Sequence, residues 1–213
     1  MRIFATGAIL VGLAGCAGAK VTNIASAPGS SVPPRDVLVA ASVAPSLPPS
    51  QAAIAGKVAA NLQAELVKRL TKNGIAAEAY RPGTLHPGAA VLDVTIVNAD
   101  PGNLAERFVV GFGLGKATLQ VKADLVSGDT AGANTEVAFD TSSDSGIKPG
   151  LILPGGIALA TGNAIHLAIG GAIDVATNLH GGLARPTTNT AAAIIRQVKT
   201  YYASVGWPWP AES

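Results

Sequence analysis

The clearest pattern in the chain is a run of apolar residues at every fourth position between residues 54 and 70. Five residues carry it: Ile54, Val58, Leu62, Leu66 and Leu70. This spacing places their side chains on one face of an α-helix. Pro48-Pro49-Ser50 precedes the pattern and Asn73-Gly74 follows it, as expected at the start and end of a helix. The pattern therefore predicts an amphipathic helix that buries one stripe against a core.

A second pattern, of period two, predicts β-strands. It is cleanest at residues 116–125, where small and aliphatic residues occupy every second position and polar residues lie between them. The polar set is Lys116, Thr118, Gln120, Lys122 and Asp124. Strand signals also occur at residues 36–43, 75–80, 90–98, 104–110 and 135–141. Such alternation is typical of an antiparallel sheet with one covered face and one wetter face.

Two more helices are expected toward the C-terminus. Residues 187–205 form one of them, which ends at Gly206. Residues 157–179 form the other, and alanine recurs along it at every fourth position. The alanine line is Ala160, Ala164, Ala168, Ala172 and Ala176. Small residues at this spacing let two elements approach closely. The line either packs on the protein's own sheet, which we favour, or docks a partner or a second copy.

The predicted elements define an α+β fold: an antiparallel or mixed sheet of about four to five strands with helices packed on one face. The chain has 213 residues, which suits one domain. We assign residues 35–207 to that domain and residues 208–213 to a tail. Residues 16–34 are small, polar and Pro-containing, and predict a flexible tether.

The N-terminus has the layout of an export signal. Arg2 is followed by about ten apolar residues and then by small residues, over residues 1–15. The apolar run is too short to span a membrane as a helix, which needs about 20 residues. Residues 1–15 are therefore expected to be a signal peptide.

The end of that segment, Leu13-Ala14-Gly15-Cys16, resembles the lipobox of bacterial lipoproteins. The resemblance implies that Cys16 carries a diacylglycerol, that a peptidase cuts before it, and that its new amine is acylated. Two or three acyl chains give a durable anchor, whereas one chain is marginal. Residue 17 is Ala and not Asp, and by the same resemblance this favours the outer membrane, facing the periplasm. An ordinary cleaved signal with an incidental Cys is the alternative.

The order of strand, helix, antiparallel strands and C-terminal helix resembles a family of small bacterial envelope lipoproteins known only as a domain of unknown function. The segments that carry the resemblance are residues 111–115, 124–128, 150–183 and 201–207, and it covers most of residues 35–207. It implies an α+β domain at the cell envelope. No enzymatic activity follows from it.

Composition and motifs give little indication of chemistry. The one cysteine allows no internal disulfide, and the net charge of +2 comes without a basic run, so we expect no nucleic-acid partner. Residues 111–115 lack the spacing of a dinucleotide-binding loop. The three histidines lack metal-ligand spacing, and aspartates such as Asp124 and Asp140 lie near predicted turns. We expect no catalytic residues, no cofactor and no metal site.

The sequence thus favours a non-enzymatic lipoprotein of the cell envelope. It would be attached to the membrane through its N-terminal lipid and would bind or support an unknown envelope protein, or associate with itself. The alternative is a transport accessory lipoprotein that binds a small hydrophobic ligand or lipid. That alternative predicts an apolar cavity between the 157–179 helix and the sheet.

Overall fold

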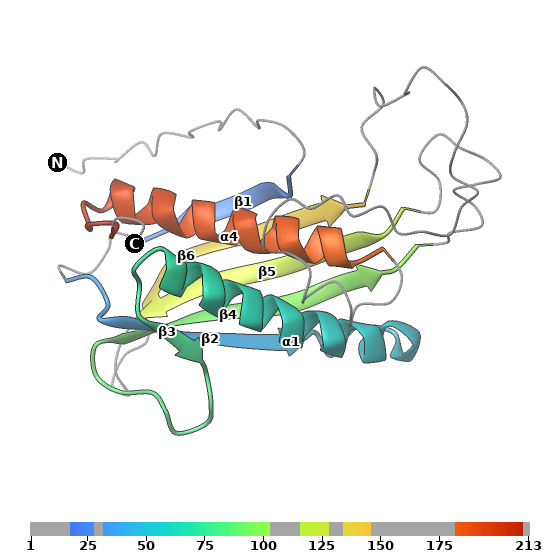
Figure 1. Ribbon diagram of the computed structural model, residues 1–213, viewed down its shortest axis with the longest axis horizontal. Helices are drawn as coiled ribbons and strands as arrows, with labels where there is room; N and C mark the ends of the chain where they lie inside the picture. Colours follow the sequence, from blue (N-terminus) through green and yellow to red (C-terminus); the bar gives the residue numbers. More distant parts are fainter. Residues whose placement is uncertain (1–17, 28–31, 103–115, 128–133, 146–181, 211–213) are drawn as a thin grey trace, which may run out of the picture.

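A computed structural model describes residues 18–27, 32–102, 116–127, 134–145 and 182–210 (Figure 1). These residues form one mixed sheet and two helices. In chain order the elements are β1 (Lys20–Ser26), β2 (Asp36–Val43), α1 (Pro49–Lys72), β3 (Ala77–Ala79), β4 (Ala89–Asp100), β5 (Thr118–Ser127), β6 (Asn134–Asp144) and α4 (Ala184–Ser204). The α+β class, with helices on one face of a mixed sheet, is confirmed. The sheet has six strands, slightly more than expected.

The strand order across the sheet is β1-β6-β5-β4-β2-β3. β2 runs parallel to both of its neighbours, β3 and β4. The other three pairs, β4–β5, β5–β6 and β6–β1, are antiparallel. A parallel pair needs a crossover connection, and α1 supplies it between β2 and β3. The predicted segments at 36–43, 75–80, 90–98, 116–125 and 135–141 all correspond to strands.

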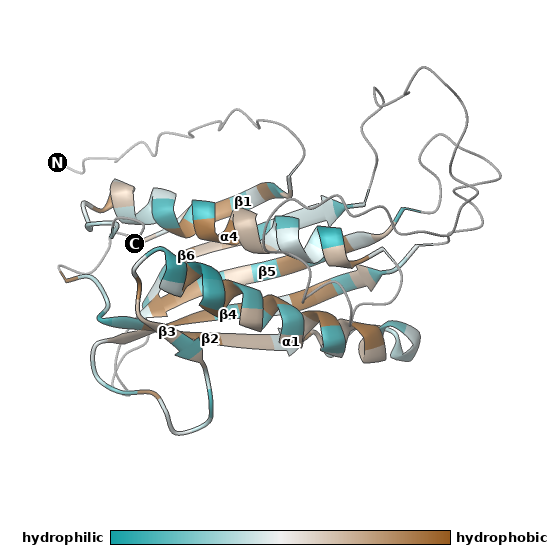
Figure 2. Ribbon diagram, in the orientation of Figure 1, coloured by the Kyte–Doolittle hydropathy of each residue, from teal (hydrophilic) through white to brown (hydrophobic). Residues whose placement is uncertain are grey.

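Both helices lie on the same face of the sheet (Figure 1), and the core fills the space between the two layers. From α1 the core takes Leu62, Leu66 and Leu70, none of which is exposed. Of the strands beneath them, β4 is largely hydrophobic, whereas β5 alternates hydrophobic and polar residues (Figure 2). The predicted alternation of β5 is confirmed, because Leu119, Val121, Ala123 and Leu125 are all fully buried in the core. The polar residues between them face away from the helices.

Both helices end in the same hydrogen-bonded motif. After α1, the N–H of Ile75 donates to the Leu70 carbonyl at 3.0 Å, and Gly74 has φ +76°. After α4, the N–H of Trp207 donates to the Tyr202 carbonyl at 2.9 Å, and Gly206 has φ +75°. These are Schellman motifs, which need a left-handed residue that glycine adopts without strain. The two helix ends predicted from sequence are therefore confirmed.

The flexible tether predicted over residues 16–34 is wrong for part of its length. Residues 20–26 form β1, which pairs antiparallel with β6 at the edge of the sheet. The predicted strand at 104–110 and the predicted helix at 157–179 lie outside the described residues. The tail assigned to residues 208–213 is partly packed, since Trp209 lies against the core and meets the Tyr202 ring edge-to-face at 5.2 Å.

Candidate functional site

Cys16, the predicted lipid attachment residue, lies outside the described part of the chain, which begins at Gly18. The alanine line from Ala160 to Ala176 also lies outside it. The structure shows where the chain that follows Cys16 enters the domain.

The chain enters beside α4. A Cβ placed on Gly18 would lie 3.4 Å from Nη2 of Arg196, an exposed residue of that helix. β1 starts only two residues later, at Lys20. An extended chain spans at most about 3.3–3.6 Å per residue, so Cys16 lies within roughly 7 Å of Gly18. A lipid on Cys16 would therefore hold Arg196 close to the membrane surface.

The two helices that cover the sheet carry a strong excess of positive charge. Together they have seven basic residues and one acidic residue, Glu65. The basic residues are Lys57, Lys68, Arg69, Lys72, Arg185, Arg196 and Lys199. The other described residues reverse this balance, with five basic and eight acidic side chains. The described part of the domain is therefore polarised, with a positive helix layer and a negative remainder.

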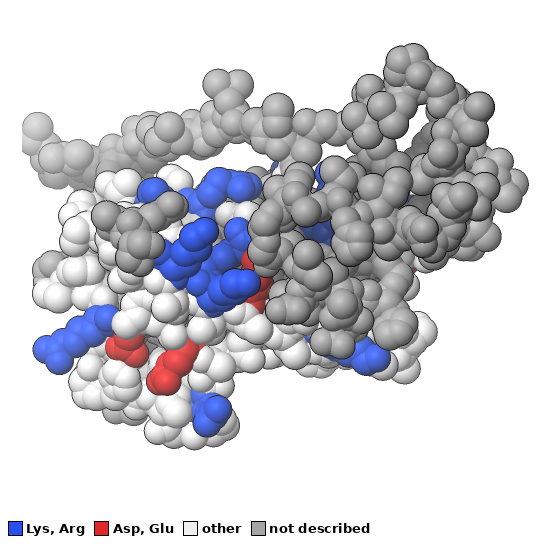
Figure 3. All heavy atoms as spheres, viewed as in Figure 1, with Lys and Arg blue, Asp and Glu red and all other residues white. Residues whose placement is uncertain are grey.

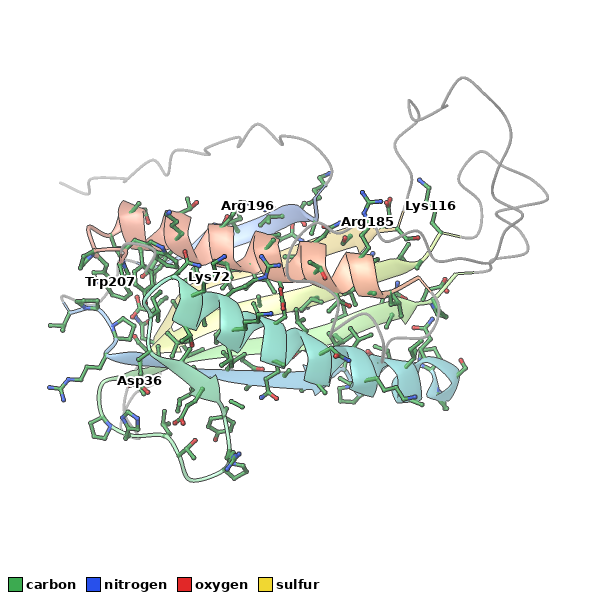
Figure 4. The ribbon with its side chains drawn as sticks, in the orientation of Figure 1. Asp36, Lys72, Lys116, Arg185, Arg196 and Trp207 are labelled. Carbon is green, nitrogen blue, oxygen red and sulfur yellow. The ribbon has the colours of Figure 1, made fainter. Side chains whose placement is uncertain are left out.

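Four exposed residues concentrate this charge where the two helices run side by side. We call Lys68, Lys72, Arg196 and Lys199 the basic surface. Figure 3 shows lysine and arginine side chains gathered near the centre of the helix face, and Figure 4 places Lys72 on α1 and Arg196 on α4. Arg69 is partly neutralised, because its Nη2 lies 2.7 Å from Glu65. Lys199 Nζ lies 5.8 Å from the centroid of the Trp209 ring, a cation–π contact.

The opposite face of the sheet carries three aspartates and Lys122, together with apolar residues such as Val91. Asp93 on β4 and Asp124 on β5 are direct register partners, and Asp140 on β6 accepts a hydrogen bond of 2.6 Å from Asn23. Burial raises the pKa of Asp93 above its usual value of 3.8. Burial also raises the pKa of Asp124, with further contributions from Asp93 and Asp140 and an opposing one from Lys122. Asp124 and Asp140 lie within β5 and β6, inside the strands predicted over residues 116–125 and 135–141.

Replacing Asp93 with Asn is expected to stabilise the protein at neutral pH. A raised pKa in the folded state means that folding favours the protonated form of Asp93. The contribution of protonated Asp93 to stability is therefore complete below pH 3.8 and is lost as pH rises through the folded pKa. Removing one of two opposed like charges should raise the free energy of unfolding by about 0.2–1 kcal/mol at pH 7. Urea unfolding at pH 7 and at acid pH measures this difference.

The gain should shrink as pH falls below the range in which Asp93 ionises. Lys122→Gln is the matched control, because it removes a cation that favours ionised Asp124 and should lower stability at pH 7. An Asp93→Asn variant that is no more stable than the parent at pH 7 would contradict the argument.

A buried carboxyl group, Glu136, lies between β6 and α4, and sequence analysis did not single it out. It is not exposed. One of its oxygens accepts a hydrogen bond from the Tyr201 hydroxyl and the other accepts one from the Ser127 hydroxyl. Its own backbone carbonyl accepts the N–H of Ala27 at 2.9 Å. Through the bond from Tyr201, the buried Glu136 joins β6 to α4, which is a structural role.

The described part of the chain shows no metal site around a histidine. His86 Nε2 lies 3.2 Å from Asp36 at the surface, while His166 and His180 lie outside the described ranges, as do residues 111–115. Within those ranges, no group of three or more His, Cys, Asp or Glu side chains is placed to hold a metal ion. Neither α1 nor α4, the helices described, has the length and hydrophobicity that a membrane crossing needs.

Comparison with known proteins identifies the family of this chain but assigns it no activity. No curated protein matches the chain. Two solved structures of a PelC dodecamer from Paraburkholderia phytofirmans, one with a single substitution, are 11% identical to it with a TM-score of 0.33. Each alignment covers 59% of this chain. It covers 79% of the PelC chain with the substitution and 81% of the PelC chain without it.

The fold and its segregated charges define a small α+β domain protein, with two basic helices on one face of a mixed sheet and aspartates on the other. Residues 17–162, more than half of the chain, match the family described as Domain of unknown function (DUF4410). The chain belongs to this family, which confirms the resemblance to a domain of unknown function.

Proposed function

We propose that this protein is a lipid-anchored, non-enzymatic component of the bacterial cell envelope that binds or helps to assemble another envelope component. The observation that carries the proposal is Leu13-Ala14-Gly15-Cys16 directly after a short apolar run. A lipid on Cys16 supplies the anchor, and Ala17 directs the protein to the outer membrane, facing the periplasm. The PelC structures are too dissimilar to support this.

The position of β1 supports an anchored role. Only three residues separate Cys16 from Lys20, the first residue of the sheet. An anchor this close restricts how the domain can turn relative to the membrane, and therefore which faces a partner can reach. A long tether would leave the orientation free. The polarised charge of the domain gives such a partner two chemically distinct faces, since complementary charge steers association.

The experiment compares the parent with Cys16→Ser by intact mass of membrane-extracted protein. We expect the parent to begin at Cys16 and to carry the added mass of acyl chains, and we expect the variant to lose both the added mass and membrane attachment. Two or three chains anchor a protein stably, so the loss should be nearly complete.

Ala17→Ser is the matched control, because it introduces the same side chain one residue later and leaves the thiol in place. It should remain acylated. A parent chain of unmodified mass, or one cut at another residue, would refute the anchor. The binding role is tested by crosslinking in intact membranes, where a discrete species of higher mass is expected and a protein found only as monomer would refute it.

A further inference from the structure

The basic surface lies on the part of the domain that the anchor would hold nearest to the lipid. Gly18 lies against Arg196, and Cys16 is within roughly 7 Å of Gly18 by chain length. Arg196 Nη2 is a further 3.4 Å from a Cβ placed on Gly18, so it lies within roughly 12 Å of Cys16. The Debye length at physiological ionic strength is about 8 Å, so salt screens a membrane charge only partly over this range. Arg196 is thus placed where it can interact with lipid headgroups.

The other members of the basic surface extend this contact along the helix layer. Lys199 follows Arg196 by three residues on α4, which places both on neighbouring positions of one helical surface. Lys68 and Lys72 have the same relation on α1, four residues apart. All four are exposed, and the paired Glu65 is the one acidic residue on these two helices.

The far side of the domain carries the opposite charge. Asp93, Asp124 and Asp140 lie on the sheet face that the helices do not cover, and they outnumber Lys122 on the same face. An anionic membrane would attract the helix layer and repel this face, so both charges favour the same orientation.

From these observations we propose that the basic surface rests on anionic phospholipid headgroups of the membrane in which Cys16 is anchored, with the aspartate face turned away. This inference rests on the proposed lipid anchor. The phosphates of the headgroups accept hydrogen bonds from the ammonium groups of Lys72 and Lys199 and from the Arg196 guanidinium. The anchor supplies attachment, and the basic surface determines orientation.

The test uses the native lysines as probes. Purified lipidated protein is reconstituted into vesicles of phosphatidylcholine alone, or of phosphatidylcholine with phosphatidylglycerol, and is acetylated briefly. Mass spectrometry then gives the rate at each lysine. We expect phosphatidylglycerol to slow acetylation of Lys72 and Lys199 severalfold and to leave Lys122, on the opposite face, unchanged. Added salt should restore the rates.

Charge variants test which residues are responsible. The double variant Lys72→Gln, Arg196→Gln should abolish protection of Lys199, whereas Lys122→Gln should leave it intact. These side chains are exposed, so the fold should tolerate both changes, and circular dichroism checks this. Equal rates in the two kinds of vesicle, or protection of Lys122, would overturn the inference.

A third sample, native membranes that contain the protein, separates a lipid partner from a protein partner. Protection that occurs in native membranes but not in the vesicles that contain phosphatidylglycerol would identify an acidic protein as the partner and overturn the lipid contact. Intact mass distinguishes this inference from the proposed function. A lipidated chain without protection overturns only the orientation, whereas an unlipidated chain overturns the anchor as well.

Discussion

Trp207→Ala is expected to lower the free energy of unfolding by about 3–5 kcal/mol, the usual cost of removing a buried indole. Trp207 is 6% exposed and closes the core beyond the end of α4. Its ring meets Tyr201 edge-to-face at 5.6 Å and Tyr202 at 5.1 Å. Aromatic pairs of this geometry add about 0.5–1.5 kcal/mol to the value of burial alone. Urea unfolding followed by far-ultraviolet circular dichroism measures the loss.

Two controls separate ring packing from simple size. Trp207→Phe keeps a ring at the same position and should cost clearly less than the alanine variant. Trp209→Ala removes the same side chain two residues later, where it is only half-buried against Tyr202 and Lys199. It should also cost less than Trp207→Ala. Equal losses for the two tryptophans would contradict the larger contribution expected of Trp207.

The sequence predicted the structure correctly where a local pattern of residue types is compatible with only one backbone conformation. The repeat from Val58 to Leu70 fitted a single helix face, and its end at Asn73-Gly74 follows from the left-handed residue that a Schellman motif requires. The alternation around Val121 likewise fixed which face of β5 is buried. Such local patterns identify elements and their inner faces because burial and backbone geometry constrain the same residues.

The sequence was uninformative where tertiary contacts decided the structure. β1 is an edge strand of mostly exposed residues, with Val21 only partly buried against the core, so it has no apolar alternation to reveal it. The aspartate pair of Asp93 and Asp124 depends on the register between two strands. Neither the edge strand nor the basic surface can be predicted from local spacing, because both depend on which elements become neighbours.

Glu136 shows the same limit at a single residue. The alternation of β6 places Val137 and Phe139 toward the helices and predicts that Glu136 faces away from them. The register shifts here, since Leu125 pairs with Val137 but Val126 pairs with Thr135. A bulge of this kind inserts one residue and changes where its side chain points. Glu136 is that residue, and it meets Tyr201 on α4.

Removing the Tyr201 hydroxyl should therefore be costly. Tyr201→Phe keeps the ring but leaves the buried Glu136 carboxyl group without one of its two hydrogen-bond donors. Hydrogen bonds to charged groups contribute about 1.5–3 kcal/mol, and we expect a loss of that size in urea unfolding at pH 7. Tyr202→Phe, the equivalent change at the neighbouring buried tyrosine, is the control and should cost less.

Glu136→Gln identifies the cause of the loss. A neutral amide is less costly to leave partly unpaired than a carboxylate, so Tyr201→Phe should cost less when it is combined with Glu136→Gln than in the parent. Groups that share one hydrogen bond typically show coupling of about 0.5–3 kcal/mol in such a cycle. Strictly additive losses would show that the contact contributes nothing to stability.

Alkaline pH provides an independent measurement of the same contact. Burial, together with the hydrogen bond to Glu136, raises the pKa of Tyr201 well above its usual 10, and burial raises the pKa of Tyr202 to about 12. Both tyrosines are therefore held protonated by folding. Their contribution is complete below pH 10 and is lost as pH rises through the folded pKa values. The parent should lose stability steeply above pH 10, and Tyr201→Phe should lose it less steeply because one of the two protonated groups is gone. If Tyr201→Phe loses stability with the same slope as the parent, then folding does not hold Tyr201 protonated. That result would contradict the effect assigned to its burial beside Glu136.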